Sequence, residues 1–528
     1  MMIFKSPHPD VTIPDVSVPE FVLRHATRLG DKPAIIEATS GRTLTYAQLA
    51  ADVRKLAAGL SARGFGKKDV LAIYSPNVPE YAAVLLAVNS LGGICTTANP
   101  LYTAGELAKQ LDDSGARILV TVPPFLDKAR EAAGKAGVKD IFVIGKADGA
   151  GSLSELMQTA GDPPAVKINP AEDLAVLPYS SGTTGLPKGV MLTHRNLVTN
   201  MRQCEGMESF ESFLEHDVVL GVLPFFHIYG MVVVLQMTLA KGGTIITMPR
   251  FDMEEFLAAV AKYRISVAPL VPPIVLGLAK HPAVDNYDLS SLRIIMSGAA
   301  PLGEALAREA GARIGCKLAQ GYGMTEASPV THLTPTTNPG YKLGSLGMPV
   351  PNTEVMIADP ETGKPLGRGE HGEIWIRGPQ IMKGYLGRPE ATAESIDADG
   401  WYHSGDIGYV DDDGYFFAVD RMKELIKYKG MQVAPAELEA LLVTHPAIAD
   451  AAVIPVSDEE AGELPKAYVV LRAGQSLDAE SLMDFVSGQV APHKRIRLVE
   501  FVEQIPKSAS GKILRRVLID QERARAKG

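Results

Sequence analysis

The chain has 528 residues and a mass of 56.4 kDa, which is enough for three or four units of roughly 150 residues each. Hydrophobic residues make up 46% and charged residues 21%, a composition that excludes a wholly disordered protein. The net charge of −9 argues against a general nucleic-acid binder.

The cysteines and the two ends of the chain predict a cytoplasmic protein. Cys95, Cys204 and Cys316 are far apart and form no CxxC pair, which fits a reducing compartment. The N-terminal segment is too polar and proline-rich for a secretory signal, and the final RARAKG carries no lipidation or peroxisomal signal. The longest apolar stretches, such as Tyr81–Val88, are shorter than the roughly 18 residues of a membrane span, so no span is expected.

Helix-like and strand-like patterns alternate between residues 45 and 300. Tyr46–Gly64 carries apolar residues at helical spacing, and Val70–Tyr74 is a short apolar run typical of a buried strand. A second helix is expected at Glu80–Leu91, and further strands at Arg117–Val122 and Ile141–Ile144. This alternation predicts an α/β fold with parallel sheet and crossover helices, while an α+β arrangement stays open.

Beyond residue 340 the pattern changes to short alternating strands. Glu354–Ala358 and Glu373–Arg377 alternate apolar and polar residues, and Asp411–Gly414 is a strong hairpin turn. A helix is expected to begin at Pro435. We therefore predict a large domain of residues 1–420, with parallel or mixed sheets and a β-rich subdomain, and a small α+β domain of residues 421–528.

The segment Tyr179–Gly189 reads YSSGTTGLPKG and follows an apolar run. Its glycines let the backbone approach an anion closely, while its hydroxyls and Lys188 can bind phosphate oxygens. It is not a P-loop, because Pro187 precedes the lysine and a glycine follows it. A flexible turn would explain a single glycine, but the whole string predicts a phosphate-binding loop.

Three further motifs combine glycines with side chains suited to a nucleotide. In GYGMTE, the glycines around Tyr322 permit close approach to a flat ring, and Glu326 is a hard oxygen ligand of the kind Mg²⁺ prefers. Asp406 in WYHSGD can accept hydrogen bonds from a pair of ribose hydroxyls. Lys512 follows a glycine, so it lies on a flexible loop where a cation can stabilise negative charge on a phosphate. The alternative interpretations are that GYGMTE and Asp406 belong to ordinary turns and that Lys512 is a surface lysine without a role in binding.

Together these motifs resemble the adenylate-forming enzymes, the group that contains acyl-CoA synthetases, firefly luciferase and the adenylation domains of peptide synthetases. The phosphate loop is similar to that family's signature, and GYGMTE (321–326), WYHSGD (401–406), DRMK (420–423) and PKSASGK (506–512) follow in the family's order. The resemblance covers nearly the whole chain. It implies ATP, Mg²⁺ and coenzyme A as cofactor and substrates, with a small carboxylic acid as the other partner.

The resemblance also assigns roles to individual residues. The catalytic residues would be Lys512, His227, Lys427 and Gln432, with Glu326 as the metal ligand and Lys423 as the hinge. The acyl pocket would be lined by Tyr229, Gly298, Gly321, Pro329 and Val330, and coenzyme A would meet Lys429 and Gly430. ATP or AMP would contact Ser180, Ser181, Gly182, Thr183, Thr184, Gly185, Lys188, Gly298, Ala299, Ala300, Gln320, Gly321, Tyr322, Gly323, Met324, Thr325, Asp406 and Arg421. For His227, a core histidine bonded to the backbone is the plain alternative.

The implied reaction has two steps. A carboxylate attacks the α-phosphate of ATP to give an acyl-adenylate and pyrophosphate, and a thiol then displaces AMP to give a thioester. In this family the C-terminal domain rotates between the steps, presenting first the Lys512 loop and then the loop at residues 427–432.

Within the family, Lys423 and the lack of a carrier domain before residue 528 favour a free-standing CoA ligase. The segments 223–230 and 423–439 resemble 4-coumarate:CoA ligases and bacterial cinnamate relatives, which predicts a hydroxycinnamate or other aryl acid as the substrate. Ser328 departs from the usual glycine beside the acyl pocket and weakens the hydroxycinnamate assignment. Trp375 also departs from that pattern and is expected to pack away from the motifs.

Two other functions stay open. One is a ligase for medium-chain fatty acids, or one that loads a carrier protein. The other is a nucleotide-binding sensor without catalysis, against which Lys512, Glu326 and the intact phosphate loop count. We expect a monomer or a homodimer.

Overall fold

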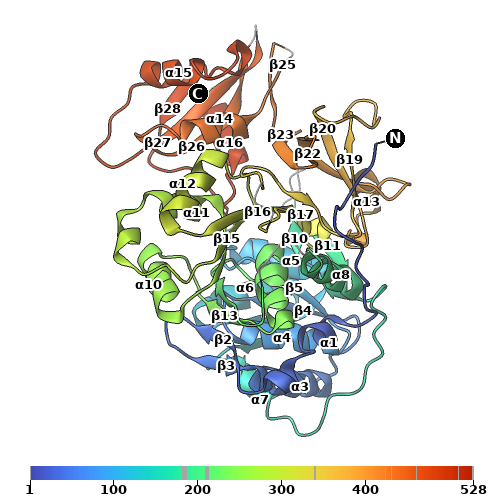
Figure 1. Cartoon of the computed structure of the whole chain (residues 1–528). Coiled ribbons are helices and arrows are strands. Elements are labelled where there is room, and N and C mark those ends of the chain that lie inside the picture. Colours follow the sequence, from blue (N-terminus) through green and yellow to red (C-terminus); the bar gives the residue numbers. More distant parts are fainter. Residues whose placement is uncertain are drawn as a thin grey trace.

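The computed structural model describes residues 2–180, 187–207, 213–337, 341–422, 424–429, 431–458, 461–508 and 511–525. Two large sheets and their helices form the body, an antiparallel sheet lies beside them, and a further sheet with its own helices forms the C-terminal end (Figure 1). We call the residues up to 422 the large unit and those from 424 the small unit.

The first large sheet has the strand order β10-β11-β9-β5-β4-β6-β7-β8. Neighbouring strands from β9 to β8 are parallel, whereas β11 is antiparallel to β9 and β10. The strands are β4 (Val70–Tyr74), β5 (Ile94–Thr97), β6 (Ala116–Thr121), β7 (Asp140–Val143), β8 (Gly151–Ser152), β9 (Leu174–Val176), β10 (Tyr179–Ser180) and β11 (Lys188–Thr193). The helices that precede or connect them are α3 (Tyr46–Ala62), α4 (Glu80–Ser90), α5 (Ala104–Ser114) and α6 (Leu126–Ala136). The predicted phosphate loop therefore joins two antiparallel strands at one end of this sheet.

The second large sheet has the order β18-β17-β16-β15-β14-β12-β13-β2-β3 and is parallel from β16 to β2. Its strands are β2 (Pro33–Glu37), β3 (Thr43–Thr45), β12 (Val218–Gly221), β13 (Thr244–Thr247), β14 (Val267–Leu270), β15 (Ile294–Ser297), β16 (Lys317–Gly323), β17 (Val330–Leu333) and β18 (Met348–Pro349). Associated helices are α8 (His194–Glu205), the π-helix η2 (Tyr229–Gln236), α9 (Met237–Lys241), α10 (Met253–Tyr263), α11 (Pro272–Lys280) and α12 (Glu304–Ile314). Ligands of such sheets bind at the carboxyl ends of the strands, and β15 and β16 end in predicted site motifs.

The remaining sheets are mainly antiparallel. The one in the large unit has the order β1-β19-β20-β22-β23, with β1 (Phe4–Lys5), β19 (Glu354–Ala358), β20 (Gly372–Arg377), β22 (Tyr402–Val410) and β23 (Phe416–Arg421). The small unit has the order β25-β24-β27-β26, with β28 beside β27. Its elements are β24 (Ile426–Tyr428), β25 (Met431–Val433), α14 (Pro435–Leu442), β26 (Ile448–Asp458), β27 (Gly462–Leu471), α15 (Ala479–Ser487), β28 (Leu498–Phe501) and α16 (Arg515–Arg525).

Helix α4 shows how the two large sheets share one core. Residues Tyr81 to Asn89 are all buried, because a helix that is apolar on every side must be covered on every side. They join a hydrophobic cluster that contains Leu71 of the first sheet and Ile245 of the second. Tyr81 also packs edge-on against Phe225, with 5.7 Å between the ring centroids.

The predicted α/β class is confirmed, and α+β is wrong for the body of the chain because the centres of both large sheets are parallel. Strands β4 and β19 have the predicted bounds, and the turn at Asp411–Gly414 joins β22 to β23. Among the described residues, none of the helices has both the length and the apolar character needed to cross a bilayer.

Candidate active site

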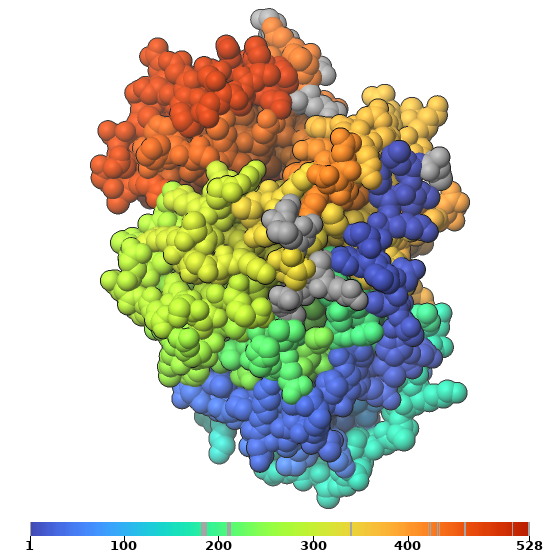
Figure 2. All heavy atoms as spheres, in the orientation of Figure 1, coloured from blue at the N-terminus to red at the C-terminus, as the bar shows by residue number. Residues whose placement is uncertain are grey.

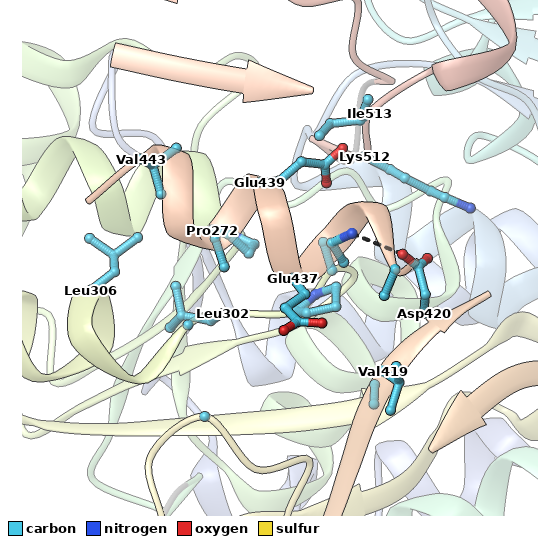
Figure 3. Close-up of a pocket in the computed structure, with 18 of the residues that line it drawn as sticks. Pro272, Leu302, Leu306, Val419, Asp420, Glu437, Glu439, Val443, Lys512 and Ile513 are labelled. Carbon is cyan, nitrogen blue, oxygen red and sulfur yellow. Dashed lines mark hydrogen bonds between the residues drawn. The ribbon is translucent and has the colours of Figure 1, made fainter. Parts of the chain in front are cut away.

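A cavity of about 1060 Å³ lies between the large and the small unit. Figure 2 shows the small unit, in orange and red, seated on the yellow-green part of the chain that contains α11 and α12. Several residues predicted from the motifs line the cavity: Ala299, Ala300, Gln320, Gly321, Tyr322, Gly323, Asp406 and Lys512. Part of this lining is drawn in Figure 3, where Lys512 and Asp420 face the same space. The fold thus brings the end of the chain to motifs that are more than a hundred residues away.

The wall suited to a nucleoside is fixed by a hydrogen bond between two motifs. The Tyr322 hydroxyl donates to Oδ2 of Asp406 over 2.6 Å, which joins the end of β16 to β22. Asp406 also lies directly opposite Arg421 in the β22–β23 ladder. The ring and the carboxylate expected to hold adenine and ribose are therefore joined by a direct hydrogen bond.

Close backbone packing explains the small residues of this wall. A Cβ atom at Gly323 would lie 2.0 Å from the carbonyl oxygen of Pro329, so only glycine fits. Asn200 fixes the adjoining strand, since its Nδ2 donates to the carbonyl of Val330 over 2.7 Å and its Oδ1 accepts the amide of Val330 over 3.0 Å. Ala299 has a φ of 69°, a conformation that non-glycine residues adopt rarely and that is common at functional sites.

Glu326 lies where the phosphate loop begins. Its Oε1 accepts hydrogen bonds from the hydroxyls of Ser180, over 2.8 Å, and Tyr385, over 2.9 Å. The ammonium of Lys188 lies 4.8 Å from the centre of the Tyr385 ring. Burial, together with the charge of Glu326, raises the pKa of Tyr385. Tyr385 therefore stays protonated and connects the predicted metal ligand to the lysine of the phosphate loop.

His227 lies beside the predicted acyl pocket and is neutral. Burial and, secondly, the charge of Lys512 lower the pKa of its ring to about 4. Its Nδ1 accepts the amide hydrogen of Tyr229 over 3.3 Å, which leaves the ring proton on Nε2. The Tyr229 ring packs on Gly298, where a Cβ atom would lie 2.8 Å from Cε1 of the tyrosine. The space above Gly298 is thus taken by a side chain of the protein itself.

Lys512 lies on a tight loop that touches the large unit. Lys507 and Ile513 pair across the base of the loop, and the amide of Ser508 donates to the carbonyl of Lys512 over 2.8 Å. At the tip, a Cβ atom on Gly511 would lie 3.1 Å from Cγ2 of Val271, just before α11. Contact with the large unit is thus made by the residue that precedes Lys512.

The second predicted loop lies elsewhere. Lys427 and Lys429 are exposed on the β24–β25 hairpin, and neither lines the cavity. The amide of Lys427 donates to Oε2 of Glu463 over 2.7 Å, within the small unit. The predicted residues Ser181, Gly182, Thr183, Thr184, Gly185, Lys423 and Gly430 lie outside the described residues, as do the side chains of Arg421 and Gln432.

Two aromatic residues of the site were missed or misplaced by the sequence analysis. Tyr385 contacts Glu326 because β21 (Gly384–Tyr385) pairs with β11, and no local sequence pattern predicts that pairing. Trp375 was expected to lie away from the motifs, which is wrong: its ring stacks on His403 of WYHSGD with 3.8 Å between centroids. Its Nε1 also donates to Glu373, whose other oxygen accepts the amide of Gly405, the residue before Asp406.

Comparisons with known proteins agree with this geometry. Residues 22–386 match the family model of AMP-binding enzymes, and residues 437–512 match that of the AMP-binding enzyme C-terminal domain. The chain is 48% identical over 524 residues to 4-coumarate–CoA ligase 1 of Solanum tuberosum, covering 98% of this chain and 96% of that protein. ATP-bound MatB from Rhodopseudomonas palustris has a TM-score of 0.86 and 31% identity, over 96% of this chain and 99% of MatB. The anthranilate CoA ligase AuaEII shares the fold, with a TM-score of 0.89 and 24% identity over 98% of this chain and 99% of that chain.

Proposed function

Because the chain belongs to the family of AMP-binding enzymes, we propose that it is an ATP-dependent acid–CoA ligase that works through an acyl-adenylate. The observation that carries the proposal is the cavity that combines Tyr322 and Asp406 with Lys512 from the other unit. Such a site can bind a nucleoside triphosphate and place a cation beside the phosphate that reacts.

In the first step, an oxygen of the acid attacks the α-phosphate of ATP, a new P–O bond forms, and pyrophosphate leaves. Tyr322 stacks on adenine, Asp406 and Arg421 bind the ribose, and Lys188 and the phosphate loop bind the phosphates. Lys512 lies between the two anionic reactants and stabilises the charge that develops on the α-phosphate. The low pKa of His227 keeps its ring neutral, and its one ring hydrogen lies on Nε2 because Nδ1 accepts the amide of Tyr229. His227 donates this Nε2 hydrogen to the carboxylate of the acid.

The residues around Glu326 fit a magnesium ion. Mg²⁺ prefers one or two carboxylates together with phosphate oxygens. Among the described residues, the hydroxyls of Ser180 and Tyr385 both donate to Oε1, so Oε2 is the oxygen that could bind the cation. A bound Mg²⁺ would neutralise charge on the phosphates, and Tyr385 would keep the Glu326 carboxylate in position.

In the second step, the thiol of coenzyme A attacks the acyl carbon, the C–S bond forms, and AMP leaves. We assign this step to Lys427, Gln432, Lys429 and Gly430. Lys427 and Lys429 do not line the cavity, which supports a rotation of the small unit about Lys423. We accordingly retain the boundary between residues 420 and 421 as the division between the two domains.

The substrate class proposed is an arylpropenoic acid such as 4-coumarate or cinnamate. It is supported by the similarity to 4-coumarate–CoA ligases over nearly the whole chain. The acid would lie among Tyr229, Gly321, Pro329 and Val330.

The test measures CoA-thioester formation with Mg·ATP for 4-coumarate, cinnamate, benzoate, octanoate and palmitate. We expect a clear preference for the two arylpropenoic acids. A preference for octanoate would keep the chemistry and refute the substrate class. If no acid yielded thioester or released pyrophosphate, the ligase proposal would be wrong and a nucleotide-binding sensor would replace it.

A further inference from the structure

Helix α14 of the small unit lacks a cap of its own. Its N-cap residue is Ala434, which has no side-chain acceptor, and its first residue is Pro435, which has no N–H group. The first backbone N–H group of the helix, on Ala436, donates to Oδ2 of Asp420 over 2.8 Å (Figure 3). Asp420 belongs to β23 of the large unit, so the cap of this helix comes from the other side of residue 423.

The capping carboxylate is well placed to hold the helix. Asp420 is 7% exposed, and a hydrogen bond to a carboxylate is stronger when water is excluded. A negative charge also interacts favourably with the amino end of a helix. The bond therefore ties α14 to the large unit in the orientation seen here.

Helix α14 also packs against the large unit. A Cβ atom on Gly303, at the start of α12, would lie 3.6 Å from the Cβ of Ala440 in α14. Val443, the residue directly after α14, lines the same cavity as Leu302 and Leu306 of the large unit (Figure 3). A rotation of the small unit about residue 423 would break these contacts together with the Asp420 cap.

A buried ion-pair cluster connects α14 to the Lys512 loop. Arg515, three residues after Lys512, donates to Oε2 of Glu439 in α14 over 2.5 Å and also pairs with Glu424, directly after the hinge position. Burial lowers the pKa of Arg515, but the charges of Glu439, Glu424 and Asp420 outweigh it and raise that pKa. The orientation of α14 therefore determines where Lys512 lies.

We propose that Asp420 is a positioning residue for the first half-reaction: by capping α14 across the hinge, it holds the small unit where Lys512 meets the nucleotide site. The assignment of Asp420 to one half-reaction rests on the proposed function. The hydrogen bond from Ala436 to Asp420 is independent of that function. Since the second half-reaction needs another orientation of the small unit, Asp420 serves adenylation and is dispensable for thioester formation.

The first test measures orientation without using activity. In the double variant Gly303→Cys/Ala440→Cys, the two Cβ atoms have the spacing of a disulfide, so its rate of oxidation reports how often α14 occupies this position. We expect the further change Asp420→Ala to slow disulfide formation by about tenfold, the effect of removing one helix cap, and Asp420→Asn to slow it less.

The matched control is Asp478→Ala. Asp478 caps α15 by accepting the amide of Ser481 over 2.9 Å, so its removal deletes the same kind of bond without spanning the hinge. The disulfide should form at the parental rate in this variant. An equal rate with Asp420→Ala, or equal slowing with Asp478→Ala, would overturn the proposal.

The second test separates the half-reactions. In Asp420→Ala we expect acid-dependent pyrophosphate release to fall about tenfold, as for one lost cap, while CoA-thioester formation from pre-formed acyl-adenylate stays within about twofold. Equal losses in both would instead assign Asp420 to nucleotide binding through its neighbour Arg421, and the proposal would be wrong. Failure of the parent protein to make thioester would refute the ligase function, while the disulfide test would still decide the role of Asp420.

Discussion

The two walls of the cavity are built in different ways. On the large unit, Tyr322, Asp406 and Glu326 are fixed by direct hydrogen bonds to side chains of other elements. On the small unit, Lys512 lies on a loop that approaches the large unit at Gly511. One wall is preformed, and the other depends on how the small unit is oriented.

This difference separates binding from chemistry. A preformed wall can bind a nucleotide in any orientation of the small unit. In the proposed mechanism, the cation for the α-phosphate is supplied by a unit that must move for the second step. Changes on the large unit should therefore affect nucleotide and metal affinity, and changes on the small unit should affect individual half-reactions.

The largest expected effect on the chemical step follows from removal of Lys512. In Lys512→Ala we expect pyrophosphate release to fall by about 10² to 10³, the usual loss when one group that stabilises a transition-state charge is removed. ATP affinity and thioester formation from pre-formed acyl-adenylate should change little. Both half-reactions are measured in single turnovers.

The control for Lys512→Ala is Arg516→Ala, which deletes a cation close by in sequence that is 76% exposed and faces Asp520. Its rates should stay close to those of the parent. If Lys512→Ala left pyrophosphate release unchanged, the assignment of the small-unit wall to the chemical step would be wrong.

A disulfide that fixes the small unit in the orientation seen here should allow the first half-reaction and block the second. The oxidised Gly303→Cys/Ala440→Cys protein should form acyl-adenylate once and make almost no thioester, because the hairpin with Lys427 cannot reach the cavity. Thioester formation should return on reduction. Rapid thioester formation by the oxidised protein would show that both steps use the orientation seen here.

Local patterns predicted the elements better than the contacts between them. The strand Val70–Tyr74 and the turn Asp411–Gly414 follow from side chains within a few residues of each other. Tyr385 meets Glu326, and Trp375 meets His403, only through strand pairs that bring distant segments together. The π-helix at Tyr229–Gln236 also could not be predicted, since a continuous apolar run is compatible with either a helix or a strand.

The motif residues could be predicted because the same motifs occur in the family that the sequence resembles. The side chains that form hydrogen bonds with them could not be predicted in this way. The sequence predicted Glu326 as a ligand, but the hydroxyl of Tyr385 comes from a strand 59 positions away. Likewise, DRMK predicted a hinge and a ribose contact, but the Asp420 cap depends on the placement of α14. Side chains that position other side chains have no spacing rule of their own.

Tyr385 offers a smaller perturbation of the preformed wall. Tyr385→Phe removes the hydrogen bond to Glu326 and keeps the ring beneath Lys188. The Mg²⁺ concentration that gives half-maximal adenylation should rise about threefold to tenfold, the effect of losing one hydrogen bond of ordinary strength. Tyr385→Leu removes the ring as well, and should also raise the KM for ATP. Equal behaviour of the two variants would mean that only the hydroxyl matters and that the ring near Lys188 contributes nothing.

The smallest expected effect concerns the stability of this wall in acid. His332 is fully buried beside Tyr322 and Phe416, and burial lowers its pKa to about 3. The unfolded chain binds a proton near pH 6.5 that the folded chain does not, so the free energy of unfolding falls as the pH drops below that value. Between pH 7 and 5.5, His332 should account for about 1 kcal/mol of that loss.

The variant His332→Phe tests this contribution, because it keeps an aromatic ring but cannot take up a proton. Urea unfolding at the two pH values should give a loss of stability that is about 1 kcal/mol smaller in the variant than in the parent. His194 and His227, each with a pKa lowered to about 4 by burial, act in the same direction and stay present in both proteins. Identical losses in the parent and the variant would mean that His332 is protonated without unfolding, and that this wall is less rigid than its hydrogen bonds indicate.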